Sequence, residues 1–132
     1  MATRVLMVFD FPRAVKPDYD FAEEFADPDG SYTENDVYRA LLECGYEVHR
    51  LSLFDDVRPL LDAVRDVNPD VIFNLCDTFK NVTHWDKNIL ATMELLGIPC
   101  TGASSSALFL CNDKGLCKKI LRFHRVRVPR FH

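Results

Sequence analysis

The sequence has no long apolar run. No stretch approaches the roughly 20 consecutive apolar residues that span a bilayer, and the apolar residues 5–9 are too few for the core of a signal peptide. We therefore expect no membrane partner and a cytoplasmic location. The chain has 132 residues, of which 48% are hydrophobic, as is ordinary for a globular protein. Residues 1–132 are accordingly expected to form a single domain with its own core.

Two common nucleotide-binding loops are also missing. The sequence contains neither a GxGxxG turn nor a GxxxxGK[ST] loop, and none of its 5 glycines falls between Gly45 and Gly97. An independent nucleotide site of either type is thereby disfavoured. The 5 cysteines form no CxxC pair, and the histidines lack metal-ligand spacing. Four cysteines fall on apolar stripes or beside buried strands, which predicts free, buried thiols, whereas Cys76 falls in a loop.

Charge is unevenly distributed around the net value of -4. Residues 1–112 carry 9 Lys and Arg against 19 Asp and Glu, whereas residues 113–132 carry 7 against 1. Three explanations of the basic segment stay open: a nucleic-acid patch, a solvated helix face, or a surface that meets phosphates or an acidic neighbouring domain. Because the acidic remainder of the chain would repel a polyanion, we expect no nucleic-acid partner.

Apolar runs alternate with helical patterns along the chain. Residues 5–9 and 71–73 are continuous apolar runs, typical of strands covered on both faces, whereas residues 46–51 mix charged and apolar side chains as an edge strand does. Apolar residues recur at helical spacing over 37–44 and 57–64. This alternation predicts an α/β fold with three α/β/α layers and a parallel sheet of about four strands in the order 2-1-3-4.

The fourth strand of that sheet is expected over residues 98–101. A preceding helix ends at Gly97, where glycine adopts the left-handed conformation without strain. Pro99 cannot donate a ladder hydrogen bond, so this strand belongs at a sheet edge or begins at its proline. A short helix over residues 107–111 follows, and residues 126–131 are expected to form a further strand.

Lys114 falls in the first turn of a second predicted helix. Asn112 or Asp113 can cap the free backbone N–H groups of this helix. Because a helix dipole favours anions at that end, a lysine beside open N–H groups indicates a phosphate partner. The simpler alternative is a solvated lysine on an amphipathic helix.

Residues 11–32 form a long acidic loop that does not fit the alternation. The loop leaves the carboxyl end of the first strand, which is the edge where open parallel sheets place ligands. Asn74 and Asp77 emerge at the same end of the third strand and can face a cleft, although Asn74 can equally tie loop backbone together. Cys76 and His84 lack an orienting partner, which disfavours a catalytic dyad.

Three segments resemble the N-terminal, pre-ATP-grasp domain of D-alanine:D-alanine ligase-like ATP-grasp enzymes. They are residues 70–77, residues 94–102 and the pair Asp113-Lys114. The resemblance covers residues 70–132 well and the first half only in outline. It implies a Rossmann-like domain of an ATP-dependent carboxylate–amine ligase. In such a reaction ATP phosphorylates a carboxylate, and an amine then attacks the acyl phosphate to give an amide or peptide bond.

The resemblance also implies roles for particular residues. Lys114 would lie near the ATP phosphates, and Asn74 and Asp77 would line the substrate cleft. In the ligases a short loop after the first strand carries a glutamate that meets the substrate amine. Asp27 or Asp29 could take this place in the longer loop of the present chain, the simpler explanation being a solvated acidic loop.

The remaining expectations concern partners. Residues 113–132, a basic helix and strand, would lead into ATP-grasp domains that supply the adenine pocket, a glycine-rich loop and the acids that hold Mg²⁺. ATP and Mg²⁺ are expected in the full-length enzyme and neither on this chain alone, which would be inactive. Small-molecule carboxylate and amine substrates are expected, with a homodimer as one candidate assembly. The alternative function is a stand-alone α/β binding or signalling module, for which Asp10 and Thr101 stand at strand ends.

Overall fold

The computed structural model describes residues 2–16, 19–22, 24–25 and 32–130. Among the described helices, none combines the length and the apolar character that crossing a bilayer requires. The elements follow one another along the chain as β1 (Arg4–Asp10), α1 (Thr33–Glu43), β2 (Glu47–Leu53), α2 (Arg58–Val67), β3 (Val71–Leu75), the 3-10 turn η1 (Thr83–Trp85), α3 (Asp86–Leu95), α4 (Ser105–Asn112) and α5 (Lys114–Phe123).

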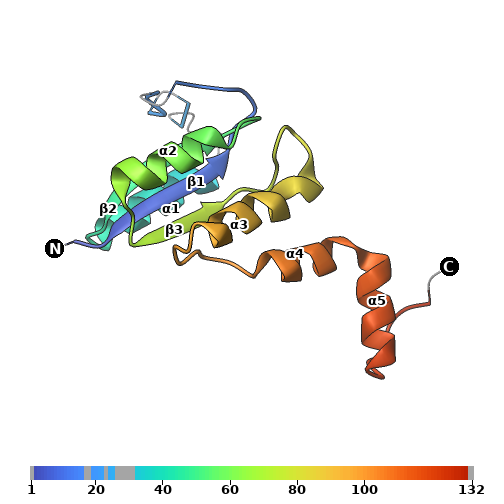
Figure 1. Cartoon of the computed structure of the whole chain (residues 1–132). Helices are drawn as coiled ribbons and strands as arrows, with labels where there is room; N and C mark the ends of the chain where they lie inside the picture. The colour runs from blue at the N-terminus through green and yellow to red at the C-terminus, as the bar shows by residue number, and fades with distance from the viewer. Residues whose placement is uncertain (1, 17–18, 23, 26–31, 131–132) are drawn as a thin grey trace.

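The sheet is parallel, with β1 between β2 and β3 (Figure 1). β1 pairs with β2 over its whole length and with β3 from Val5 to Phe9. All five residues of that stretch are buried, because a central parallel strand is covered by helices on both faces. The α/β class and the strand order 2-1-3 are therefore as expected.

The expected fourth strand is reduced to a single parallel bridge between Ile72 and Cys100. The Ile72 N–H donates to the Pro99 carbonyl at 2.8 Å, and the Thr101 N–H donates to the Ile72 carbonyl at 3.0 Å. Pro99 has no N–H with which to extend the ladder, and the chain turns at Gly102 with φ +106°. The described residues thus form three strands rather than about four, with the bridge in the place expected of the fourth.

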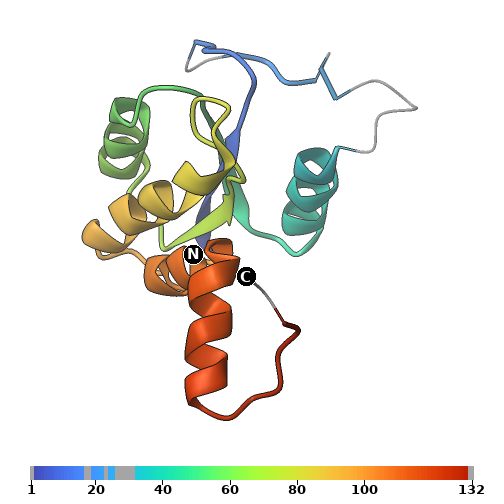
Figure 2. The same ribbon diagram turned by 90° about the vertical axis from the view of Figure 1, so that its right-hand side faces the viewer.

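Two apolar clusters lie on opposite faces of the sheet. Figure 2 shows α1 on one side and α2 and α3 on the other, which is the three-layer arrangement. The described part of the 11–32 loop covers the same face as α1, through the buried Phe21 and Phe25. The cluster under α2 and α3 has as its buried members Leu6, Val8, Leu53, Leu60, Ile72, Cys76, Ile89, Leu90 and Met93.

α4 packs on α3, with Leu108 against the cluster described above, whereas α5 extends away from the sheet (Figures 1 and 2). Asp113 caps α5, since its Oδ1 accepts from the Leu116 N–H at 2.8 Å. The helix ends in a reversal at Arg125, whose φ is +60°. Residues 126–130 then run back without strand structure, so the expected strand over 126–131 is wrong for the described residues. Pro129 and the absence of a neighbouring strand edge in the described structure explain why no ladder forms.

The cysteines depart in part from the expected burial. All five are free thiols, but of the four predicted to be buried Cys100 and Cys117 are half-buried and Cys44 and Cys111 are exposed. The last two are exposed because they lie at or beside the ends of α1 and α4. Cys76 lies in a loop just past a strand, as expected, yet it is the most buried of the five, with 6% of its surface exposed. The Asp10 and Asn74 contacts described below hold its loop against the core.

Adjacent leucines in α2 give a direct test of the packing. The side chain of Leu60 is 0% exposed and that of Leu61 is 42% exposed. Leu60→Ala should therefore lower the free energy of unfolding by about 2–5 kcal/mol through the cavity it leaves. Leu61→Ala, the matched control, should change it by no more than about 0.5 kcal/mol. Urea unfolding of both variants measures the difference, and equal losses would contradict the described orientation of α2.

Candidate functional site

The Asp10 carboxylate holds together the carboxyl ends of β1 and β3. Its Oδ1 accepts from the Asp77 N–H at 2.8 Å, and its Oδ2 accepts from the Thr78 hydroxyl at 2.6 Å. Both oxygens are thus engaged by the chain leaving β3. Asp10 therefore holds this loop against the end of β1, and we call these two hydrogen bonds the Asp10 latch. Because both oxygens are engaged, Asp10 is not the free aspartate that a signalling module would need at this strand end.

Asn74 and Thr101 brace the same loop from the other side. The Asn74 side-chain oxygen accepts from the Cys76 N–H at 3.1 Å, and the Asn74 N–H donates to the Thr101 hydroxyl at 3.0 Å.

The Cys76 side chain is buried beneath this loop. Burial, and then the nearby Asp10 and Asp77 carboxylates, raise the pKa of its thiol, so it stays protonated and is a poor nucleophile. His84 lies in a different hollow, so the dyad is not formed.

A cavity of about 280 Å³ opens at this edge of the sheet, and Asn74 and Asp77 both line it. Two further carboxylates line the cavity, from the first turns of two helices: Glu34 of α1 and Asp86 of α3. Among the described residues that line the cavity there is no lysine, arginine or histidine. We call this hollow the acidic cavity, and its charge favours a ligand that presents an ammonium group. Within the described ranges no group of three His, Cys, Asp or Glu side chains could hold a metal ion.

Sequence reasoning missed Glu34 and Asp86. Each is an acidic residue in the first turn of its helix. A helix that follows a strand of a parallel sheet and packs back on it begins at the carboxyl edge. An acidic residue in the first turn of such a helix could therefore have been predicted from the sequence to line the cavity.

Lys114 lies in a second hollow, of about 390 Å³, beside the acidic cavity. The link between the two is the Asn112 side-chain amide, which donates to both oxygens of Asp86 at 3.0 and 3.3 Å. Asp86 lines the acidic cavity, whereas Asn112 lines the hollow of Lys114. We call the second hollow the basic pocket; its lining residues are His84, Lys87, Phe109, Asn112, Asp113 and Lys114.

α4 is fixed to α3 at its other end as well. The Glu94 carboxylate accepts from the Ser105 N–H at 2.8 Å and from the Ser105 hydroxyl at 2.5 Å. These hydrogen bonds hold the pKa of Glu94 below its usual value. With the Asn112–Asp86 contact, both ends of α4 are tied to α3, so the start of α5 has a defined position beside the acidic cavity.

Asp27 and Asp29 lie outside the described residues. The described part of their loop is well packed, because the Tyr19 hydroxyl donates to Glu24 Oε1 at 2.6 Å and Arg13 donates to both Tyr19 and Glu24. The hydrogen bonds from Tyr19 and then Arg13 lower the pKa of Glu24. Two members of this network contact the aromatic cluster, since the Arg13 guanidinium lies over the Phe11 ring and the Tyr19 ring packs edge-on against Phe21.

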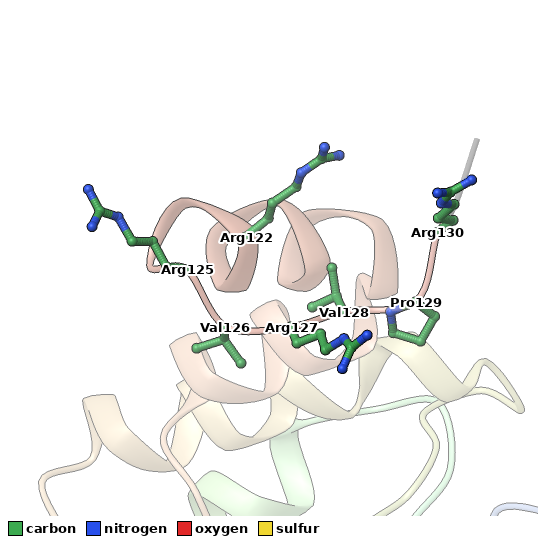
Figure 3. Close-up of a pocket in the computed structure, with 7 residues that line it drawn as sticks. All are labelled: Arg122, Arg125, Val126, Arg127, Val128, Pro129 and Arg130. Carbon is green, nitrogen blue, oxygen red and sulfur yellow. The ribbon is translucent and has the colours of Figure 1, made fainter.

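A larger hollow, of about 520 Å³, lies between α5 and the chain that follows it. Four arginines line it, yet Figure 3 shows their guanidinium groups pointing in different directions. Arg122, Arg125 and Arg130 project away from the rest of the molecule, whereas Arg127 projects to the opposite side. Their charges do not converge on one ligand position, so this hollow does not form a specific anion-binding site.

Known proteins with similar sequences are ligases. A D-alanine–D-alanine ligase of Zymomonas mobilis is 33% identical over 93 residues, which cover 70% of this chain and 27% of that protein. D-alanine–D-alanine ligase A of Bacillus cereus is 41% identical over 44 residues, or 33% of this chain and 15% of that protein. No model of a protein family matches the chain. The chain is a relative of the N-terminal part of D-alanine–D-alanine ligases.

A solved structure agrees with this relationship at the level of the fold. The D-alanine–D-alanine ligase of Bacillus anthracis, crystallised with ATP, superposes with a TM-score of 0.67 at 22% identity. The superposition covers 98% of this chain and 37% of that ligase. The chain thus covers 15 to 37% of the length of these ligases, so it matches one part of them.

The Asp10 latch can be tested by hydrogen exchange. Asp10→Ala removes the acceptor of the Asp77 N–H, so this amide should exchange about tenfold faster, as expected for the loss of about 1.4 kcal/mol of protection. Asp70→Ala is the matched control, because Asp70 accepts from the Arg4 N–H at 2.8 Å at the opposite end of the sheet. Nuclear magnetic resonance resolves the two amides, and unchanged exchange at Asp77 in Asp10→Ala would contradict the latch.

Proposed function

We propose that the chain is the N-terminal, substrate-side domain of an ATP-dependent carboxylate–amine ligase similar to D-alanine–D-alanine ligases. The observation that carries the proposal is the adjacency of two hollows of opposite charge, separated by the Asn112–Asp86 hydrogen bond. A ligase of this class must hold a cationic amine and an anionic phosphate chain next to each other. The sequence relationship to the ligases supports the same function independently.

The acidic cavity is the proposed substrate wall. Asp77 and Asp86 offer carboxylates to the ammonium group of an amino-acid substrate, and Asn74 fixes the loop that carries Asp77. An attacking amine reacts as the free base, so a nearby carboxylate can also accept the proton that the ammonium loses. The acyl donor and the acceptor are both small molecules in this proposal.

Lys114 is the proposed contact to ATP. ATP supplies the phosphoryl group that activates the carboxylate, and a cation held beside the transferring group stabilises the charge that moves during transfer. Lys114 is exposed at the start of α5 and lies in the basic pocket. We assign the adenine pocket and the acids that bind Mg²⁺ to an ATP-grasp region outside this chain, as the family resemblance implies.

The proposal is tested in the protein that joins this chain to its ATP-grasp region. That protein should release ADP from ATP and Mg²⁺ only when an amino-acid substrate such as D-alanine is present. Lys114→Ala should lower kcat/KM for ATP by about 10- to 100-fold, because one charged donor to the phosphates is lost. Lys119→Ala, an exposed lysine of the same helix outside the pocket, should change it less than about twofold.

One result would overturn the whole proposal, and a second would overturn its assignment of Lys114. The first is a coding sequence that does not continue into an ATP-grasp region, which would favour the stand-alone binding or signalling module. The second is unchanged ATP kinetics in Lys114→Ala, which would remove the role given to this residue. Screening amino acids and dipeptides in the same ADP-release assay would identify the acceptor and donor.

A further inference from the structure

Lys87 shares the basic pocket with Lys114, although the two residues are far apart in the sequence. Lys87 is the second residue of α3 and Lys114 is the first residue of α5. Both helices begin at the same end of the molecule in Figure 1. The sequence patterns gave Lys87 no role, and its position beside Lys114 is a consequence of the fold.

The Asn112–Asp86 hydrogen bond brings the lysines together. Asp86 directly precedes Lys87, and Asn112 stands two residues before Lys114. The amide of Asn112 donates to both Asp86 oxygens, so the two chain segments are joined immediately next to each lysine. The pocket is thus built by a specific tertiary contact rather than by chance proximity of long side chains.

In the described structure the two lysines of the pocket are not paired with carboxylates. Among the described residues, neither lysine forms an ion pair within 4.0 Å, and His84 forms none either. The Lys87 ammonium donates to the His84 carbonyl, which is a neutral acceptor and leaves the ammonium two further N–H donors. Both lysines therefore remain available as cations.

Two carboxylates are near the lysines, and both have donors of their own. Asp113 accepts from the Leu116 N–H at 2.8 Å. Asp86 accepts from Asn112 and, at 2.6 Å, from the Lys87 N–H. The positive ends of the α3 and α5 dipoles also lie at this place. The residues that line the pocket include two lysines against the single Asp113 carboxylate, and this positive balance favours an anion.

We propose that Lys87 and Lys114 together form a two-lysine site for the phosphate chain of a nucleoside triphosphate. Two cations on separate helices suit a chain of linked phosphates, because each lysine meets a different phosphate group. Lys87 supplies the second cation. Since Asp86 is its neighbour in the first turn of α3, Lys87 also joins the phosphate site to the acidic cavity. The identity of the ligand as a nucleotide rests on the proposed function, whereas the anion site itself does not.

Inorganic triphosphate is the probe for this site in the chain as it stands. Titrated at low salt, it should shift the backbone amide resonances of residues 84–87 and 112–117. Lys87→Ala and Lys114→Ala should each weaken the binding about two- to fivefold, as expected for one exposed ion pair of up to about 1 kcal/mol. Lys87→Arg should retain binding, and Lys119→Ala, which removes the same net charge outside the pocket, should leave it within about 1.5-fold.

The outcomes separate this site from the function. If Lys87→Ala binds triphosphate as tightly as Lys119→Ala does while Lys114→Ala is weakened, the two-lysine site is wrong and the ligase proposal stands. If the shifts spread evenly over all lysines, binding is non-specific and the site is also wrong. If both pocket variants are weakened but the protein with its ATP-grasp region uses no ATP, the site stands and the ligase proposal falls. Circular dichroism of each variant checks that these exposed substitutions leave the fold unchanged.

Discussion

The hydrogen bonds from the Asn112 amide to the Asp86 carboxylate are the interaction on which the candidate site depends. Asp86 belongs to the acidic cavity, and Asn112 belongs to the basic pocket that contains Lys114. This contact therefore joins the proposed amine site directly to the proposed phosphate site. Because α5 extends away from the sheet, the position of Lys114 relies on this contact and on the Glu94–Ser105 contact at the other end of α4.

The sheet places the other half of the site. With β1 paired to β2 and β3 in parallel, the strands end at one edge and the following helices return from it. Asp10 joins the ends of β1 and β3 by accepting from the Asp77 N–H and the Thr78 hydroxyl. The loop that carries Asp77 is consequently fixed before any ligand arrives, and a preorganised wall of this kind is what orientation of a substrate requires.

The sequence was sufficient where local rules decide the structure. Asn74 and Asp77 lie at the carboxyl end of β3, so the apolar run over 71–73 was enough to place them at this edge of the sheet. Glu34, Asp86 and Lys87 were missed because each is an ordinary surface residue in its helix, and only tertiary packing brings the helix starts together. The expected fourth strand is only a single bridge because Pro99 has no N–H to donate to the ladder. The strand expected over 126–131 failed because a strand needs a partner edge, which no local pattern supplies.

The central claim is that a phosphate chain lies at Lys114, beside an acidic wall that receives an amine. A crystal structure of this chain joined to its ATP-grasp region, with Mg²⁺ and a non-hydrolysable nucleoside triphosphate, tests it most directly. The account predicts phosphate oxygens within hydrogen-bonding distance of Lys114 Nζ and an intact Asn112–Asp86 contact. A nucleotide whose phosphates lie away from the basic pocket, with Lys114 facing solvent, would contradict it.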